Sequence, residues 1–377
     1  MKKWMFGIKD LEDAKFLEEN GFKDFVIGYK PDLIKVLNNA GYNVHLVLGT
    51  FKIIEKFKSV EYLAEDPYGR KHIWFGSGCP NNPEIRKYTL DRIREIIANY
   101  DVKSIILDGI RFASPGSGLE AFATCFCEHC RRKAEDMGFS YDKMKKAVKY
   151  LLYNLYDFRK IKNDLDSYAY TPLSLIDFTE KNLGLVDWIK FREMSIMEFI
   201  KEVKNLILSI RPNVRLGAYI FTPSLAVLVG QNYSEIWKYL DFIKPMVYRI
   251  GKGVACLNYE LAIIAKDLLR WNSWLSEEEV LRILYKFFGF SEYQNYPLSV
   301  KAILEEGLPI SCIEKEFIMA KKLVLGKTEI HPIVMLHDSS LGDVVQIAYK
   351  TGMDGIDFFT FRKELKDNVI KINEVVK

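Results

Sequence analysis

Long apolar stretches are absent from this chain of 377 residues. Its longest weakly polar run, "YIFTPSLAVLVG", is shorter than the roughly 20 apolar residues that cross a bilayer, and it contains Pro223. The N-terminal "MKKWMFGIKDLEDAKF" passes at once from a few apolar residues to charged ones, whereas a signal peptide needs a longer apolar stretch. We therefore expect no membrane segment and no export, which makes the cytoplasm the predicted location.

The chain also lacks a block of charge of one sign. Its net charge of +4 comes from 54 Lys and Arg against 50 Asp and Glu, and the two signs are interleaved along most segments. Basic tails and dense basic patches are typical of nucleic-acid binding. Composition therefore gives no support to nucleic acid as a partner. The sequence carries no indication of the oligomeric state.

Short apolar runs rich in β-forming residues alternate with amphipathic helical stretches from end to end. Eight runs read as strands: residues 4–8, 25–29, 44–51, 104–112, 215–221, 242–248, 332–337 and 355–361. Short strands that are apolar on both faces and separated by helices are typical of a parallel sheet covered on both sides. Eight such units in one chain predict an α/β fold of the (β/α)8 TIM-barrel type.

A doubly wound open sheet is the alternative architecture. It is disfavoured because no glycine-rich phosphate loop follows the first strand, and no GxxxxGK[ST] motif occurs anywhere. No linker, low-complexity tract or internal repeat divides the chain. We therefore predict one barrel domain over residues 1–377, with helical insertions after strands four and six at about 113–187 and 250–330.

Polar side chains follow several of the predicted strands, at the ends where TIM barrels build their active sites. Strand four carries Asp108 and Arg111 in "LDGIRF", strand seven leads into His337 and Asp338, and strand eight contains Asp357. Paired carboxylates are what cleavage of a glycosidic bond requires. Asp108, Asp338 and Asp357 are therefore the catalytic candidates, although Asp108 could instead form a buried ion pair with Arg111.

Aromatic residues accompany these carboxylates, and sugar rings stack on the faces of Trp and Tyr. Cleavage by a nucleophilic Ser or Cys is not indicated, because no lysine–serine or cysteine–histidine pattern is present. The candidate substrate-binding residues are Trp74, Asn81, Arg111, Tyr219, Tyr248 and His337.

One stretch goes beyond composition and spacing: "CPNNPEIRKYTLDRIREIIANYDVKSIILDGIRFASP", residues 79–115. It resembles the glycosyl-hydrolase-like 10 family, which carries an Asn-Pro…Pro-Glu-Val-Arg segment, a helix, and then "nYdvDGIhlDyiRyP". The matching residues are Asn82, Pro83, Glu84, Arg86, Tyr100, Asp101, Val102, Ile106, Leu107, Asp108, Ile110, Arg111 and Phe112. "YLDFIKPMVYR" and "GMDGIDFFTF" resemble two later strands of the same barrels. The resemblance implies a barrel related to glycoside hydrolases, a carbohydrate substrate, and Asp108 as the catalytic carboxylate.

The chain departs from this family at two places near the aspartate. The family's "DGI" is Lys103, Ser104 and Ile105 here, and its tyrosine after the aspartate is Gly109. These changes favour a second hypothesis, a carbohydrate-binding or scaffold barrel that has lost catalysis.

Cys125, Cys127 and Cys130 form a C-x-C-x2-C motif, one ligand short of a tetrahedral thiolate site. Cys79 ends the loop after strand three, and adjacent barrel strands would bring that loop beside the motif. The order of a lone cysteine followed by this motif is similar to the zinc site of family 42 β-galactosidases. The resemblance implies a structural zinc held by these four cysteines, which would fix the loops after strands three and four.

Other interpretations of the cysteine cluster stay open. His129 could replace one cysteine as ligand, the thiols could be unmetallated core residues, or two of them could form a redox pair. A zinc knuckle that stacks RNA bases on Phe126 is a third functional hypothesis, that of a nucleic-acid binder. Cys256 and Cys312 stand alone in helical segments and are predicted to be core residues.

Overall fold

The computed structural model describes residues 1–167, 172–290 and 295–376. Its centre is a nine-stranded sheet in the order β10-β11-β1-β2-β3-β6-β7-β8-β9, and every neighbouring pair is parallel. The strands are β1 Lys2–Phe6, β2 Asp24–Ile27, β3 Asn43–Gly49, β6 Ser104–Asp108, β7 Arg215–Ile220, β8 Phe242–Pro245, β9 Glu329–Ile330, β10 Ile333–Met335 and β11 Gly355–Phe359. The predicted parallel sheet is therefore confirmed.

The sheet curls until its two ends meet. Beyond β8, Met246 forms a parallel bridge with Ile333 of β10, and the Val247 amide donates to the Ile333 carbonyl at 3.1 Å. All eight predicted strands overlap an observed strand, but the short β9 was not predicted. It is separated from β10 by His331 and Pro332, and proline has no N–H to donate to a ladder.

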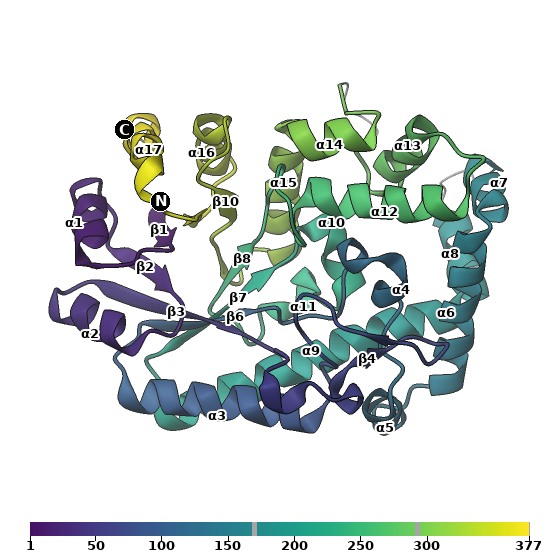
Figure 1. Cartoon of the computed structure of the whole chain (residues 1–377), viewed down its shortest axis with the longest axis horizontal. Helices are drawn as coiled ribbons and strands as arrows, with labels where there is room; N and C mark the ends of the chain where they lie inside the picture. The colour runs from purple at the N-terminus through teal and green to yellow at the C-terminus, as the bar shows by residue number, and fades with distance from the viewer. Residues whose placement is uncertain (168–171, 291–294, 377) are drawn as a thin grey trace.

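Helices cover the outer face of this sheet (Figure 1). They are α1 Leu11–Glu19, α2 Pro31–Asn39, α3 Pro83–Asn99, α9 Leu183–Ile210, α16 Leu341–Lys350 and α17 Lys366–Val376. In α3 the buried residues Ile85, Ile93 and Ile97 recur at helical spacing. Asn82 caps this helix, since its side chain accepts hydrogen bonds from the second and third amides that follow it.

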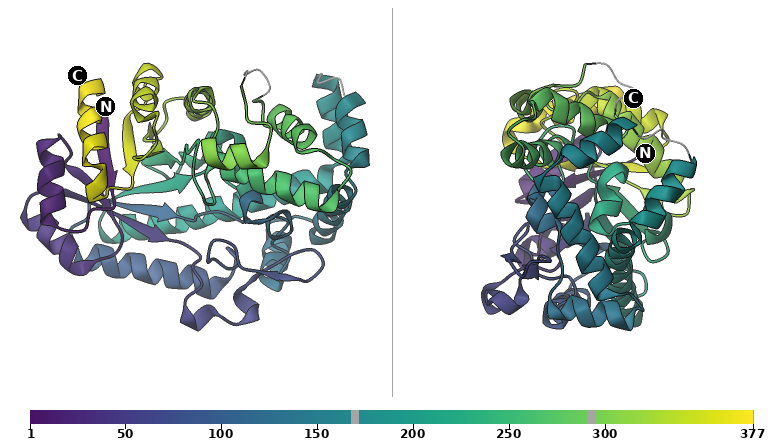
Figure 2. Two further views of the ribbon diagram at one scale, coloured as in Figure 1. Left: turned by 45° about the horizontal axis from the view of Figure 1, so that its top comes forward. Right: turned by 90° about the vertical axis from the view of Figure 1, so that its right-hand side faces the viewer.

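Two further groups of helices lie where the insertions were predicted. After β6 come η3 Pro115–Ser117, α4 Leu119–Phe122, α5 Glu128–Asp136, α6 Tyr141–Tyr156, α7 Arg159–Ser167 and α8 Pro172–Lys181. After β8 come α12 Leu257–Trp271, α13 Glu277–Phe287, α14 Val300–Glu306 and α15 Ser311–Val324. Helix α12 packs on both η3 and α6, so the two groups support each other at the end of the molecule opposite the chain termini (Figures 1 and 2).

The remaining elements are short. They are η1 Glu55–Phe57, η2 Val60–Tyr62, β4 Ala64–Glu65, β5 Lys71–His72, α10 Pro223–Ala226, η4 Val227–Val229, α11 Tyr233–Ile236 and η5 Lys363–Leu365. Buried apolar residues from the sheet and from both helix groups form one continuous core. Among the described residues, no helix combines the length and apolarity that a membrane crossing needs.

Candidate active site and metal centre

Asp108 is the last residue of β6 and lies half-buried at the carboxyl end of the strand. Its backbone carbonyl accepts hydrogen bonds from the amide and the hydroxyl of Thr50, at 2.7 and 2.8 Å, which fixes it to the end of β3. Burial raises the pKa of the Asp108 carboxyl, and the charges of Lys52 and Arg111 only partly oppose this. Gly109 follows with φ of +69°, a conformation that favours glycine over the family's tyrosine.

Arg111 does not form the ion pair with Asp108 that the sequence left open. Among the described residues, the one hydrogen bond of its guanidinium runs from Nη1 to the Phe112 carbonyl, at 2.9 Å. The guanidinium is surrounded by aromatic rings, with its Cζ 4.7 Å from the centroid of Trp74 and 4.8 Å from that of Phe221. Burial lowers the pKa of Arg111 to about 10, so it stays charged at neutral pH.

Trp74 is therefore not an open stacking platform in this structure. It is 1% exposed, its Nε1 donates to the Gly78 carbonyl at 3.0 Å, and Arg111 lies against its ring. Its role as a substrate-binding residue stays a prediction. Its observed contact is to the arginine rather than to an open cleft.

Asp357 lies on β11 inside the curled sheet and is fully buried. One carboxylate oxygen accepts from Lys244 Nζ at 2.9 Å and from the Tyr219 hydroxyl at 3.4 Å, whereas the other has no partner among the described residues. Burial raises the pKa of Asp357, and burial lowers the pKa of Lys244 to about 8. The lysine also lies over the ring of Trp4, 3.6 Å from its centroid.

Two of the predicted substrate-binding residues, Tyr219 and Tyr248, are influenced by the charges of both Asp108 and Asp357. Burial raises the pKa of the Tyr219 phenol, and the charges of Asp357 and Asp108 raise it further. Burial likewise raises the pKa of Tyr248, with Cys256, Asp357 and Asp108 adding to the effect. Both aspartates thus act on both tyrosines, so the structure brings these four predicted site residues near one another.

Asp338 and His337 follow β10 and are placed differently. Asp338 accepts from Arg249 Nη2 at 2.6 Å and from the Ser340 amide at 2.9 Å, and Arg249 also donates to the Leu308 carbonyl at 3.0 Å. This buried ion pair ties the loop after β10 to the segment that follows α14. His337 is exposed. The catalytic role of Asp338 and the binding role of His337 remain predictions.

Glu260 of α12 is a buried carboxylate that the sequence analysis missed. It accepts from Ser114 Oγ at 2.9 Å, the Gly116 amide at 2.5 Å and the Ala255 amide at 2.9 Å. Burial raises its pKa, and the charge of Arg111 is among the effects that lower it. It lies within a helix rather than at a strand end, so no local pattern marked it as part of this region.

The four predicted metal-ligating cysteines converge. Cys79, Cys125, Cys127 and Cys130 are all buried, and their sulfurs lie within 4.8 Å of one another. The Cys79 sulfur is 3.4 Å from that of Cys130 and 3.3 Å from that of Cys127. Four thiolates around a tetrahedral zinc, at about 2.3 Å each, place their sulfurs about 3.8 Å apart, so this geometry fits a metal ion.

Amide donors around the sulfurs support the same interpretation. The backbone amide of Asn81 donates to Cys79 Sγ and its side-chain Nδ2 to Cys130 Sγ, both at 3.4 Å, while the Glu65 amide donates to Cys125 Sγ at 3.3 Å. Such bonds stabilise thiolates and orient metal ligands. Asn81, predicted to bind substrate, therefore lies against the cysteine cluster.

His129 does not join this cluster. Its Nε2 lies 3.2 Å from the Nδ2 of Asn82, and the group of potential ligands contains only the four cysteines. Phe126 is 2% exposed, so its ring is not available to stack on a nucleic-acid base. Cys256 and Cys312 are buried and free, as expected of core residues.

A buried arginine lies beside the thiols. Arg192 of α9 stacks on Trp188, 4.4 Å from its centroid, and donates Nη2 to the Ala113 carbonyl at 2.8 Å. Its Nε and Nη1 have no partner, and among the described residues no carboxylate pairs with it. Burial lowers its pKa to about 9, and the charges of Cys125 and Cys130 oppose this shift. Thiolates in this cluster would therefore give the cation a counter-charge.

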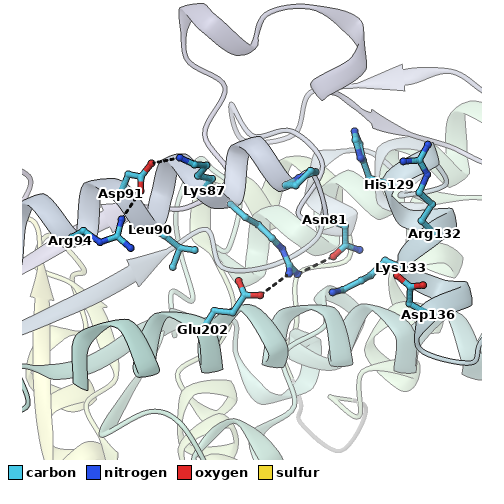
Figure 3. A pocket seen from close by; sticks show the side chains of 12 residues that line it. Asn81, Lys87, Leu90, Asp91, Arg94, His129, Arg132, Lys133, Asp136 and Glu202 are labelled. Carbon is cyan, nitrogen blue, oxygen red and sulfur yellow. Dashed lines mark hydrogen bonds and ion pairs between the residues drawn. The ribbon is translucent and has the colours of Figure 1, made fainter. Parts of the chain in front are cut away.

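A hollow of about 640 Å³ lies elsewhere, on the outer surface between α3, α5 and α9 (Figure 3). Most of its charged side chains are already paired with each other or with neighbours. Arg86 bonds Glu198 at 3.0 Å, and Lys87 and Arg94 both bond Asp91, at 3.4 and 2.7 Å. We therefore place the candidate active site at the strand ends and not in this hollow.

Comparison with known proteins finds relatives by structure only. No protein-family model and no curated protein sequence matches the chain. The glycoside hydrolase domain of PgaB (BpsB) from Bordetella bronchiseptica matches all of this chain and 98% of that domain, with a TM-score of 0.55 and 8% identity. The catalytic domain of the Paenibacillus polymyxa β-amylase matches with a TM-score of 0.54 and 13% identity, over 100% of this chain and 97% of that one.

A β-galactosidase from the Antarctic haloarchaeon Halorubrum lacusprofundi has a TM-score of 0.57 at 12% identity. All of this chain is covered there, but it spans only 57% of the β-galactosidase. Identities this low establish a shared fold alone. The chain has the TIM-barrel-like fold of these glycoside hydrolases, and the specific resemblance to the glycosyl-hydrolase-like 10 family is not matched by any family model.

Proposed function

We propose that this chain is a single-domain (β/α)8 glycoside hydrolase, in which β9 and β10 form one barrel strand interrupted at Pro332. The observation that carries the proposal is the position and environment of the Asp108 carboxyl. It is a half-buried carboxyl at the end of β6, its pKa is raised by burial, and no cation lies within ion-pair distance of it in the described chain. A raised pKa favours the protonated form of a carboxyl, which is the form that donates a proton to a leaving oxygen.

Asp357 is the proposed second carboxylate. Lys244 stabilises its negative charge, and the Tyr219 hydroxyl orients it. Two carboxyls with different environments can take the separate roles of acid and of nucleophile or base. Asp338 is a weaker choice than Asp357, because Arg249 already binds its carboxylate in a buried ion pair.

The cysteine cluster is proposed to hold a structural zinc through Cys79, Cys125, Cys127 and Cys130. A zinc bound by four thiolates has no open position, so it would supply no chemistry to the reaction. It would hold the loop after β3, which carries Trp74, against the loop after β6. The metal would therefore shape the site without touching the substrate.

The test is turnover of an oligosaccharide panel by the native protein and by Asp108→Asn. We expect hydrolysis of at least one saccharide, and we expect Asp108→Asn to reduce it by about 10²–10⁴-fold, the usual contribution of a general acid. Asp357→Asn should give a loss of similar size, whereas Asp338→Asn should change turnover less. Asp101→Asn, at a side chain 70% exposed, is the matched control. Undiminished hydrolysis in Asp108→Asn would contradict the assignment.

A carbohydrate-binding barrel without catalysis is the second candidate. One observation favours it: Asp357 is ion-paired and fully buried, which leaves Asp108 as the more accessible of the two carboxyls. Saccharide binding without turnover, equally strong in Asp108→Asn, would support this candidate over the first. Salt-sensitive RNA binding would instead support the nucleic-acid hypothesis, which the buried Phe126 does not favour.

A further inference from the structure

We propose that the saccharide bound beside Asp108 is acidic, and that Lys52 and Arg111 together bind its anionic group. The inference rests on the proposed function and adds the class of substrate. Lys52 Nζ lies 4.2 Å from the ring centroid of Phe75, and Arg111 Cζ lies 5.5 Å from the same centroid. The charges of both cations also act on the Asp108 carboxyl. The two cations therefore flank one ring at the edge of the candidate site.

Neither cation is neutralised by a neighbouring carboxylate. Within residues 1–167, 172–290 and 295–376, neither one makes an ion pair. Lys52 Nζ makes one hydrogen bond, to the Phe75 carbonyl at 3.1 Å. Arg111 uses one of the five N–H donors of its guanidinium, on the Phe112 carbonyl. Four guanidinium donors and most of the ammonium group are thus left for another partner.

Two other buried cations, Lys244 and Arg249, are paired with a carboxylate, whereas among the described residues Arg192, like Arg111, is not. Lys244 is paired with Asp357 at 2.9 Å, and Arg249 is paired with Asp338 at 2.6 Å. Each of those pairs is closed within the protein. Arg111, only 2% exposed, is equally buried yet has no such partner.

Glu260 is not a hydrogen-bonded carboxylate partner of Arg111. Its charge acts on Arg111, but its oxygens already accept the three donors from Ser114, Gly116 and Ala255. It compensates the guanidinium only at a distance. A buried cation without a hydrogen-bonded anion is costly, and binding an anion would relieve that cost.

The geometry suits the carboxylate of a uronic acid or the sulfate ester of a sulfated sugar. A guanidinium binds either group through parallel N–H donors, and an ammonium adds a compact second charge. Phe75 is 45% exposed and Lys52 is half-buried, so solvent reaches this cluster. A neutral sugar would leave both cations without an anion.

The experiment compares acidic saccharides with neutral forms of the same backbone. The carboxylated pair is oligogalacturonate and its methyl ester, and the sulfated pair is carrageenan oligosaccharides and their desulfated form. Binding to the full chain is measured by isothermal titration calorimetry at low and high salt. We expect the acidic member of at least one pair to bind at least tenfold more tightly, with the difference shrinking at high salt. Which pair responds identifies the anionic group.

Lys52→Gln should weaken binding of the acidic ligand by about 10- to 100-fold, which corresponds to the loss of a charge-assisted hydrogen bond. Lys56→Gln is the matched control, because Lys56 follows the same strand but its side chain is 68% exposed and points to Glu84. Arg111→Lys keeps a charge in the buried position, and it should retain more affinity than Arg111→Gln. Circular dichroism of each variant verifies the fold.

The outcomes separate this inference from the proposed function. Neutral saccharides that bind as well as acidic ones, or acidic binding unchanged by Lys52→Gln, would overturn the acidic substrate and leave the glycoside hydrolase standing. If the oligosaccharide panel used for turnover and both acidic pairs all fail to bind, both proposals fail. Tight acidic binding lost in Lys52→Gln and kept in Lys56→Gln would support both.

Discussion

The two ends of the curled sheet contain the same kinds of residues but use them differently. At the amino ends of the strands, His45 bonds Ser104 Oγ at 2.8 Å and Asp24 at 2.9 Å, while Glu329 receives Arg215 at 3.0 Å and His331 at 2.9 Å. At the carboxyl ends, Asp338 pairs with Arg249 at 2.6 Å, but Asp108 and the cations near it make no ion pair within the described chain. Polar groups that partner each other stabilise a fold, whereas polar groups left without partners are available to a ligand.

The carboxyl pKa values separate the two ends in the same way. At the amino ends, the hydrogen bond from His331 lowers the pKa of Glu329; burial alone would raise it, but Arg215 and Lys2 lower it further. Burial alone would raise the pKa of Asp24, but the hydrogen bond and charge of His45 hold it below its usual value. In Asp108, at the carboxyl end of β6, and in Asp357, in the middle of β11, burial dominates and the pKa rises.

Removing the proposed metal should give the largest change in stability, and it should act at the carboxyl ends only. Without a metal the thiols would protonate, and Arg192 would lose its counter-charge. We expect chelation or Cys130→Ser to lower the free energy of unfolding by several kcal/mol, on the order seen for structural metals and buried charges. Thermal unfolding with and without a chelator measures this.

Hydrogen exchange locates the effect. Amides in residues 64–82 and 111–135 should lose protection, whereas those of β1 and β2 should not. Cys312→Ser is the control, because Cys312 is a buried free cysteine outside the cluster. The thermal stability of the Cys312→Ser protein should remain sensitive to the chelator. Purified protein that contains no metal and ignores the chelator would contradict the proposed zinc.

The next largest effect should come from Glu329→Gln at the amino ends. The glutamine keeps the shape but loses the charge that Lys2 and Arg215 share, at a side chain 35% exposed that also bonds His331. After allowance for that exposure, we expect a loss of about 1–2 kcal/mol in urea unfolding. Asp108→Asn, the matched change at the other end, should leave stability unchanged or increase it, because burial disfavours its charge. Equal losses in both variants would remove the contrast between the two ends.

Lowering the pH should destabilise the protein through the buried histidines at the amino ends. Burial lowers the pKa of both His45 and His331 from 6.5 to about 4, so between these values the unfolded chain binds more protons than the folded one. Stability contributed by the two histidines is therefore present above pH 6.5 and is lost as the pH falls towards 4. We expect a total loss of a few kcal/mol at most, measured by urea unfolding from pH 7.5 to pH 4.

The stability contributed by the two buried aspartates should change with pH in the opposite direction. Asp108 and Asp357 have raised pKa values in the folded state, so just above 3.8 the folded chain binds the extra protons. Their contribution falls as the pH rises through that window. His331→Gln should flatten the acid loss, and Asp108→Asn should steepen it slightly. A pH dependence identical in both variants would show that these groups do not control it.

Local sequence predicted a large part of this arrangement. All eight predicted strands overlap observed ones, because apolar runs bounded by helical stretches encode a buried parallel sheet directly. The C-x-C-x2-C motif with Cys79 converged as expected, since neighbouring strands fix where their loops meet. Asp108 stands at a strand end, where position alone indicates function.

Partners between distant segments could not be predicted from spacing. Asp338 pairs with Arg249 from another strand end, and Glu260 reaches back to Ser114 from a later helix. Trp74 was predicted to bind substrate, and its contact with Arg111 could not be read from the sequence. Ser104 was considered a loss near the site, yet it lies at the opposite end of β6, bonded to His45. Each of these contacts depends on which side chains meet in the folded chain, and the local sequence pattern does not specify such long-range contacts.

Lys2→Met should have the smallest effect, although Lys2 is bonded to the same carboxylate as His331. Its Nζ lies 3.1 Å from Glu329, but the two side chains are 50% and 35% exposed, so water and salt screen the pair. Glu329 also keeps Arg215 and His331 when Lys2 is lost. We expect a loss of about 0.5 kcal/mol or less, vanishing in 0.5 M salt as roughly the Debye length predicts. A loss as large as that of Glu329→Gln would mean that the exposed rim, rather than the buried histidine, holds the amino ends together.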